Sequence, residues 1–395
     1  MKTIRIILVI LVLILLGFNI IFLTKFSKIE NSFFENIIKN EQPLENTNLL
    51  NNTKAHNGYT DGSNRNYPEI PVELFPDNHE RENGDKGFSR GFGNTNHPYS
   101  FDWFDIHMHL ASSHYPNKLK KMEIQEVVDR WFKLVGEYHS SRMILLDPYL
   151  ETMEWAKDNP RVYVFWWMKW GQSDQLPEVQ RRVDEGLIQG LKLHTGGIRG
   201  KDGTDYRMMA TPGWQKIYSW CNKNDLPVLI HLNQHWGDHR YAYGIGSKKF
   251  WERANYTNQE LLDFFLTEMV AKYPNVKWIM AHMNFQGIES LSRLFDKYPN
   301  LYVDTSIGMF LRQYDYLTPQ EVGPYREFCI KYADRLMFGT DAFAFHPLES
   351  KYPDHIRNWW LPHYIFIMQL RLPQQTLDLI THGTAEKVLG EYLKR

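Results

Sequence analysis

From about residue 101 onward, hydrophobic and polar residues alternate with two different periodicities. Short runs rich in β-branched and aromatic residues, typical of buried strands, are separated by longer stretches in which apolar residues recur at helical spacing. We expect strands at 103–107, 142–146, 162–167, 190–194, 227–232, 276–282, 301–305 and 336–341. Helices fit the gaps, for example over 124–138 and 258–272. The pattern predicts eight βα units.

Eight such units indicate an α/β fold of the (β/α)8 type, a TIM-like barrel over 101–395. The alternative is an open doubly wound sheet, which usually carries a Gly-rich phosphate loop after its first strand. No such loop follows 103–107. In a barrel the chemistry lies at the carboxyl ends of the strands, so the polar residues at those ends become the candidates for a functional site.

The first 28 residues carry a different pattern, an apolar run over 6–23 that only Gly17 and Asn19 interrupt. At about 1.5 Å per residue, a helix of this length covers roughly 27 Å, close to the thickness of a bilayer core. We therefore expect an N-terminal transmembrane helix, an uncleaved anchor over 1–28, with a cleaved signal peptide as the alternative. The short leading tail favours a single-pass membrane protein with its catalytic domain outside the cytoplasm.

Composition adds a polar linker and arm over 29–100, where Asn, Asp, Glu, Gly and Pro dominate and little apolar surface can be buried. The formal net charge of −1 and the lack of a basic run after the anchor argue against a nucleic-acid partner. Two cysteines exclude a disulfide-rich scaffold. A small-molecule substrate is the expected partner, and a homo-oligomer stays open.

Histidines and one aspartate mark the ends of four predicted strands. His107 and His109, two residues apart, point to the same side of the first strand. His231, His282 and Asp341 end the fifth, sixth and eighth strands. One histidine after an apolar run is ordinarily a core residue, but four strand ends with the same chemistry indicate a metal site. Imidazole and carboxylate ligands suit one divalent ion, Zn first and Mn or Fe as alternatives.

In order and spacing the motifs resemble those of the amidohydrolase-related metal-dependent hydrolases, in the branch that includes aminocarboxymuconate-semialdehyde and resorcylate-type decarboxylases. The similar pieces are FDIHMH at 104–109, GLKLH at 190–194, LPVLIHL at 226–232, VKWIMAH at 276–282, LYVDTS at 301–306 and RLMFGTD at 335–341. The resemblance implies that the metal ligands are His107, His109, His231 and Asp341. It also implies that Asp341 carries a proton and that His282 is the acid/base or polarising histidine.

Lys192 and His194 lie one strand period apart on the fourth strand, and both could present a donor to an anionic substrate. A carboxylated Lys192 that bridges two metals, or a structural ion pair, are the alternatives. Among the aromatic residues at the end of the third strand, Trp167 and Trp170 are the candidates for substrate contact, while the others are expected to pack. His235 and His239 lack the glutamate of a zinc-protease helix motif and are expected only to line the pocket.

The expected function is hydrolysis of a C–N or C–O bond in a small anionic substrate through metal-activated water. A metal-dependent, non-oxidative decarboxylase on the same site is the first alternative. A catalytically inactive surface binding barrel is the second, and the intact set of histidines with Asp341 speaks against it. A glycosidase would need two carboxylates at strand ends, and only Asp341 ends a predicted strand.

Overall fold

The computed structural model describes residues 102–110, 123–135, 140–195, 206–232, 258–306, 319–345 and 360–394. The chain divides after Tyr67 into two units, and all of the described residues belong to the second unit, Pro68–Arg395. The polar linker and arm predicted over 29–100, as well as His235 and His239, lie outside the described residues. The domain boundary predicted at residue 100 stays a prediction.

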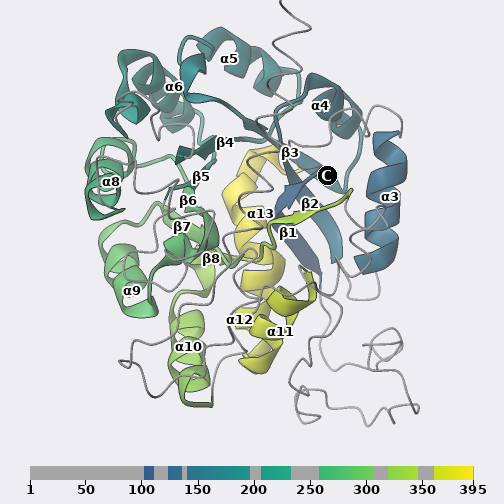
Figure 1. Cartoon of the computed structure of the whole chain (residues 1–395), viewed down its shortest axis with the longest axis vertical. Helices are drawn as coiled ribbons and strands as arrows, with labels where there is room; N and C mark the ends of the chain where they lie inside the picture. Colours follow the sequence, from purple (N-terminus) through teal and green to yellow (C-terminus); the bar gives the residue numbers. More distant parts are fainter. Residues whose placement is uncertain are drawn as a thin grey trace, which may run out of the picture. The chain divides into compact units, whose positions relative to one another are not determined.

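A parallel sheet forms the centre of the described part, with the strand order β8-β7-β6-β5-β4-β3-β2-β1-β9. Its strands lie side by side in the order of the sequence, which is what successive βα units produce. The sheet curls, as Figure 1 shows, into a TIM-like α/β fold. The strands are β1 (Trp103–His109), β2 (Ser140–Asp147), β3 (Val162–Trp167), β4 (Gly190–His194), β5 (Val228–His231), β6 (Trp278–Met280), β7 (Leu301–Asp304), β8 (Leu336–Met337) and β9 (Ala342–Phe343).

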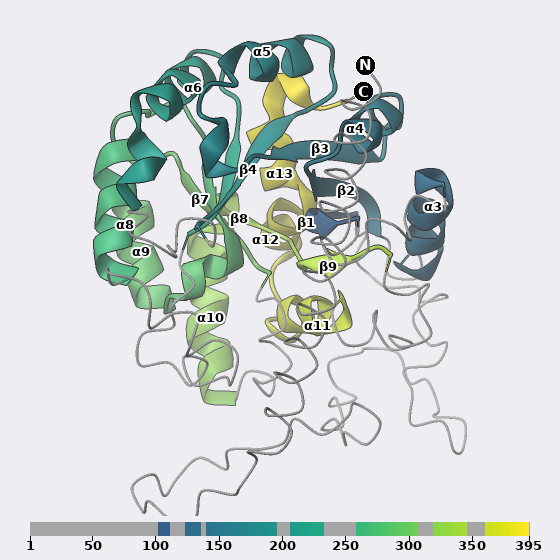
Figure 2. The same ribbon diagram turned by 45° about the horizontal axis from the view of Figure 1, so that its top comes forward.

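The segment that carries β8 and β9 hydrogen-bonds to both the seventh and the first strand. β8 pairs with β7, and a few residues later β9 pairs with β1, beside which it lies in Figure 2. Between them, the amide of Ile106 donates to the carbonyl of Phe338 at 3.0 Å, and the amide of Asp341 donates to the carbonyl of His107 at 2.7 Å. The first and last predicted strands therefore come together, and their functional residues with them.

Helices cover the outer side of the curled sheet, and Figure 1 shows α3 to α10 around it in sequence order. They are α3 (Ile124–Val135), α4 (Leu150–Lys157), α5 (Leu176–Asp184), α6 (Pro212–Lys223), α8 (Asn258–Phe265), α9 (Ile288–Lys297) and α10 (Pro319–Lys331). The C-terminal part adds α11 (Leu361–Gln369), α12 (Gln374–Asp378) and α13 (Thr384–Leu389). Alternation of strands with helices around a parallel sheet is thus confirmed, and the two-residue strand β9 was not predicted.

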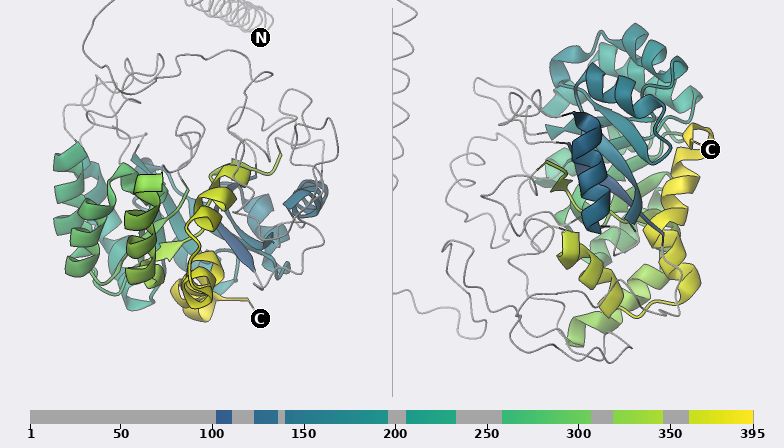
Figure 3. Two further views of the ribbon diagram at one scale, coloured as in Figure 1. Left: turned by 90° about the horizontal axis from the view of Figure 1, so that it is seen from below. Right: turned by 90° about the vertical axis from the view of Figure 1, so that its right-hand side faces the viewer.

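Both faces of the strands are apolar, because helices cover one face and the inside of the curl covers the other. The inner cluster takes alternate side chains from the strands, including Phe104, Ile144 and Tyr163. Ala385, Val388 and Leu389 of α13 belong to the same inner cluster. Figure 3 shows α13, near the C-terminus, at one end of the sheet. Because Arg142 pairs with Glu386 of α13 and with Asp102 just before β1, α13 lies at the amino-terminal end of the strands and leaves the carboxyl ends to the polar residues.

Three predicted elements differ from the structure for local reasons. The sixth strand, predicted over 276–282, ends at Met280, because His282 adopts φ 60°. The eighth, predicted over 336–341, ends at Met337, after which Asp341 adopts φ 57°. The predicted helix 258–272 becomes π-helical over Leu266–Val270. There the Thr267 hydroxyl donates to the carbonyl of Asp263 at 2.8 Å, in competition with the helical ladder.

The structure contradicts the predicted location as a single-pass membrane protein. No helix within the described ranges combines the length and the apolar character that a bilayer crossing requires. The apolar run at 6–23, on which the predicted anchor depended, lies outside those ranges.

Candidate metal and catalytic site

The residues predicted to form the site gather at the carboxyl ends of the strands. In β1, the pairing with β2 shifts register between Asp105 and Met108, and His107 lies within this irregular stretch. The imidazole centres of His107 and His109 lie 5.5 Å apart. Both Nε2 atoms approach the same carboxylate oxygen, Oδ1 of Asp341, at 3.3 Å from His107 and 3.0 Å from His109. The histidines that end the first predicted strand and the aspartate that ends the eighth therefore lie together.

Asp341 reaches the histidines because the chain turns sharply after β8. Its left-handed backbone conformation, φ 57°, is one that aspartate tolerates better than most residues. Gly339, two residues earlier, allows this approach: a Cβ there would lie 3.0 Å from Cβ of His107 and 3.2 Å from Cβ of Asp304. The side chain of Thr340 turns away and donates to Oδ2 of Asp105 at 2.6 Å. The turn thus presents Asp341 alone to the two imidazoles.

His282 enters from the neighbouring side, at the start of three consecutive residues in the left-handed region. His282, Met283 and Asn284 have φ values of 60°, 48° and 50°. The His282 ring lies 4.9 Å from the ring of His107 and 4.5 Å from that of His231. Its Nε2 lies 3.0 Å from Nδ1 of His231. The side chains of His231 and His282 are therefore within hydrogen-bonding distance of each other.

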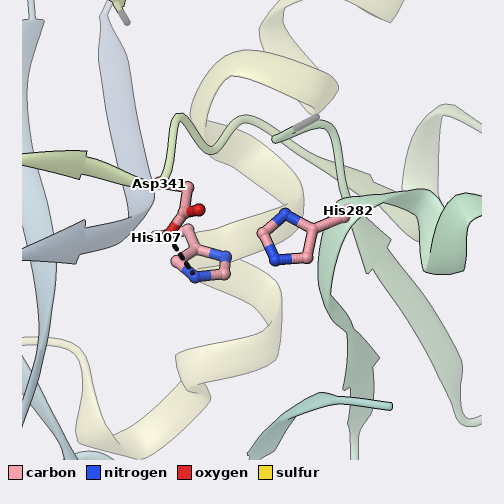
Figure 4. A group of neighbouring side chains, drawn as sticks. All are labelled: His107, His282 and Asp341. Atoms are coloured by element: carbon pink, nitrogen blue, oxygen red, sulfur yellow. Dashed lines mark ion pairs between the residues drawn. The ribbon is translucent and has the colours of Figure 1, made fainter. Parts of the chain in front are cut away.

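A close group of possible ligand atoms comes from His107, His282 and Asp341, one atom each, all within 4.8 Å of one another (Figure 4). Figure 4 shows the carboxylate beside His107 and the imidazole of His282 facing both. His109 bonds to Asp341 and His231 to His282, so each of these two predicted ligands lies one contact away from the group. The donor set, imidazole nitrogens around a carboxylate, fits a divalent ion of the Zn, Mn or Fe type.

The charges of His231, His282 and Asp341 match that chemistry, whereas at His107 burial and Lys192 lower the pKa but Asp304 and Asp341 outweigh them and raise it. Burial, and then the neighbouring His194 and His282, hold the pKa of His231 well below its ordinary value. Burial likewise lowers the pKa of His282 to about 3, so both rings are neutral near pH 7. Burial opposes ionisation of Asp341, but His107 and the hydrogen bonds from the two β1 histidines outweigh it and hold its pKa well below 3.8. Neutral imidazole and ionised carboxylate are the forms that bind a metal.

Lys192 is buried at the carboxyl end of β4, beside the proposed metal ligands. Its side chain is 1% exposed, and its Nζ lies 3.5 Å from Nε2 of His107. Burial lowers the pKa of Lys192 to about 8, and Asp304 and Asp341 oppose that shift. The structure thus places this cation against the proposed ligands, among carboxylates.

The aromatic residues at the mouth divide into two kinds. Trp167 lies between two histidine rings, 5.5 Å from that of His109 and 5.9 Å from that of His194. His194 in turn lies 4.3 Å from His231. Trp170 is almost fully buried and donates through Nε1 to the carbonyl of His194 at 2.8 Å. Trp167 stays a candidate for substrate contact, whereas Trp170 packs and fixes the end of β4.

Sequence reasoning did not assign a role to Asp304, Ser306 or Asp105. Asp304 is fully buried, and its Oδ2 accepts from Nδ1 of His107 at 2.7 Å. The Ser306 hydroxyl lies 3.2 Å from the same Nδ1 and 3.0 Å from Nδ1 of His282. Asp105 accepts from the backbone amides of His107 and Thr340, each at 3.1 Å. The available signal was a carboxylate inside an apolar strand, which is costly to bury without partners.

A second group, Asp102, His382 and Glu386, could also hold a metal by distance. Arg142 lies between its two carboxylates and pairs with each at 2.6 Å. Because the guanidinium already balances these carboxylates, the group ties α13 to the start of β1 and β2, and it is a structural ion-pair network.

Comparison with known proteins gives one family and several similar folds. A family model described as amidohydrolase matches residues 148–390, more than half of the chain. The match includes Lys192, His231, His282 and Asp341 and begins after β1. No curated protein matches the chain.

Similar solved structures include an uncharacterised TIM-barrel protein from Bordetella bronchiseptica, at 14% identity over 74% of this chain and 99% of that one, with a TM-score of 0.48. Another is 2,6-dihydroxybenzoate decarboxylase from Rhizobium, at 16% identity over 73% and 98%, with a TM-score of 0.47. A third is an amidohydrolase from Burkholderia multivorans with bound zinc, at 14% identity over 73% and 99%, with a TM-score of 0.46.

Proposed function

This chain belongs to the amidohydrolase family, and from that premise we propose that it is a metal-dependent hydrolase of a C–N or C–O bond in a small anionic substrate. One observation carries the proposal. Nε2 of His107 and Nε2 of His109 lie 3.3 Å and 3.0 Å from a single oxygen of Asp341. Two imidazoles and a carboxylate that meet at one point form a site for a divalent cation, which we expect to be Zn, or else Mn or Fe.

We assign the metal to His107, His109, His231 and Asp341, and the close approach of His282 makes that imidazole the residue beside it. A bound divalent ion of this kind lowers the pKa of water and polarises a carbonyl. Asp341 would hold the proton of the attacking water at Oδ1 and return it to the leaving group. His282, neutral because burial keeps its pKa near 3, would be the polarising residue beside that water.

The buried cation supports an anionic substrate. Lys192 offers its ammonium group beside His107, and Trp167 offers a flat ring at the mouth next to His109 and His194. A carboxylate on the substrate would meet Lys192, while an aromatic or unsaturated body would stack on Trp167. Among the described residues, these three groups are the ones we assign to substrate binding: Lys192, His194 and Trp167.

Decarboxylation on the same residues is the second candidate, and the position of Lys192 favours it. A substrate carboxylate that binds Lys192 would also lie next to the proposed metal ligands. It would then be the part of the substrate nearest to the reactive centre, and loss of CO2 would compete with hydrolysis. The two reactions are separated by their products. Hydrolysis of amides or lactones consumes water, whereas decarboxylation of aromatic carboxylates releases CO2.

The test is metal analysis of the full chain after chelation and reloading with Zn, Mn or Fe, followed by assays on amides, lactones and carboxylates. We expect about one equivalent of metal, in line with a mononuclear site, and its loss in the His107→Ala/His109→Ala double variant. His382→Ala, at the opposite end of the strands, is the matched control and should keep the metal. The absence of bound metal in the wild type, with no stabilisation by added metal, would overturn the proposal.

A further inference from the structure

One buried carboxylate, at the end of β7, contacts the segments that carry two of the site histidines. Oδ2 of Asp304 accepts from Nδ1 of His107 at 2.7 Å. Its Oδ1 accepts from the backbone amide of His282 at 2.8 Å and from the amide and hydroxyl of Ser306 at 3.0 Å and 2.5 Å. Asp304 is 0% exposed, so these bonds are its means of remaining charged inside the protein.

The hydroxyl of Ser306 has one proton, and its contacts decide where that proton goes. A carboxylate can only accept, so at 2.5 Å from Oδ1 of Asp304 the hydroxyl donates to it. Toward Nδ1 of His107 and Nδ1 of His282, at 3.2 Å and 3.0 Å, the same oxygen can then only accept. Both imidazoles must therefore carry their proton on Nδ1. The carbonyl of Ser306, 3.1 Å from Nδ1 of His282, requires the same tautomer.

The assignment extends to a third ring. A neutral imidazole protonated on Nδ1 has a lone pair on Nε2. Nε2 of His282 therefore accepts, and Nδ1 of His231, 3.0 Å away, donates to it. His231 then also carries its proton on Nδ1, which leaves its Nε2 as a metal-binding nitrogen. One carboxylate thus sets, through Ser306, the protonated nitrogen of three histidines.

Asp304 also holds the backbone that aims His282. Three consecutive non-glycine residues with positive φ are strained and persist only where the surroundings fix them. The 2.8 Å bond from the His282 amide to Oδ1 of Asp304 acts at the first of the three. The same side chain therefore fixes both the direction and the tautomer of the His282 ring.

We propose that Asp304, with Ser306, is the positioning residue of this site: it holds a proton on Nδ1 of His107, His282 and His231, so that a metal would bind His107 and His231 through Nε2 while Nε2 of His282 accepts from His231. The part that concerns metal affinity rests on the function proposed above. The part that concerns tautomers does not, because it describes the protein without metal.

The decisive variant is Asp304→Asn, which keeps the shape and one accepting oxygen but places an NH2 group where an oxygen was. When that NH2 faces Nδ1 of His107 it donates, so His107 must move its proton to Nε2. We expect metal affinity, measured by chelator competition with Zn, to fall about 10–100-fold, the usual cost of losing such a partner. In long-range 1H–15N spectra of the metal-free full chain, recorded at a pH where the ring is neutral, His107 should change from the Nδ1-H to the Nε2-H form.

Asp105→Asn is the matched control, because Asp105 is an equally buried carboxylate that bonds to the amide of His107 and to Thr340 but to no imidazole. It should leave the tautomers and the metal affinity unchanged. If both variants weaken metal binding equally, or if His107 keeps its Nδ1 proton in Asp304→Asn, the positioning role is refuted.

The wild-type spectra test the proposal even if Asp304→Asn does not fold. Signals assigned through His107→Asn and His282→Asn should both show the Nδ1-H form at a pH where the rings are neutral, and an Nε2-H form for either overturns the assignment. A wild type that binds no metal but has these tautomers would refute the proposed function and leave the positioning role standing.

Discussion

Replacement of Gly339 by alanine tests how tightly the site is built. The added Cβ would lie 3.0 Å from Cβ of His107, 3.2 Å from Cβ of Asp304 and 3.4 Å from its Cγ. Carbon atoms in contact are ordinarily about 3.5–4.0 Å apart, so these neighbours must separate by roughly half an ångström. Overpacking of this kind costs about 1–3 kcal/mol. Because His107 and Asp304 share the 2.7 Å bond, the strain falls on the ligand and its partner together.

Urea unfolding in the presence of a chelator measures the loss of stability, and chelator competition with Zn measures the loss of affinity. Gly171→Ala is the control, since a Cβ at that position meets nothing within 4 Å and the residue is exposed. It should change the free energy of unfolding by no more than about 0.5 kcal/mol. If Gly339→Ala is as stable as Gly171→Ala and binds Zn as tightly, the site is not packed as described and the reasoning fails.

Three further predictions concern stability. Burial raises the pKa of Asp147 to about 6, so the folded protein holds this proton more tightly than the unfolded chain, and the contribution of Asp147 falls as pH rises from about 4 to about 6. As pH rises over that interval, the free energy of unfolding of Asp147→Asn should therefore increase relative to that of the wild type, by at most about 3 kcal/mol in denaturant titrations. A difference between the two proteins that does not change with pH would contradict this. Gly190→Ala would place a Cβ 2.5 Å from the ring of Phe165, so it should destabilise the protein and be partly rescued by Phe165→Leu in a double-mutant cycle. The Nδ2 group of Asn300 donates to three carbonyl oxygens. Asn300→Ala should therefore lower the free energy of unfolding by about 1–3 kcal/mol, and Asn300→Asp should lower it further, because a carboxylate cannot donate. Equal losses in the two variants would refute the role of Asn300 as a donor.

The positions of the strands could be predicted from the sequence because each strand is apolar on both faces and bounded by turn residues. The same reasoning places His107, His109 and Asp341 together, since carboxyl ends of adjacent parallel strands meet at one edge. In the structure Nε2 of His107 and Nε2 of His109 both lie within 3.3 Å of Oδ1 of Asp341. The roles given to these residues stay predictions.

The left-handed residues could not be predicted. Histidine and asparagine adopt positive φ more readily than most residues, but no residue pattern indicates that His282, Met283 and Asn284 all do so in succession. As a result, the strand was extended two residues too far, and the direct contact between His282 and His231 was missed. The partners of the imidazoles were also missed, although Asp304 could have been suspected from its place among apolar neighbours in β7. A strand pattern gives the face of a side chain but not its hydrogen bonds.

The position of α13 sets a time at which the fold can be completed during synthesis. Residues 385–389 pack against side chains that begin with Phe104, so the inner core needs sequence from both extremes of the described unit. At about 5–20 residues per second, a ribosome takes roughly 15–60 s to pass from the first of these positions to the last. Until then the amino-terminal end of the sheet exposes Phe104, Ile144 and Tyr163 to water and to other chains. Nascent chains of this protein therefore spend most of their synthesis with an uncovered apolar surface, the state that chaperones bind.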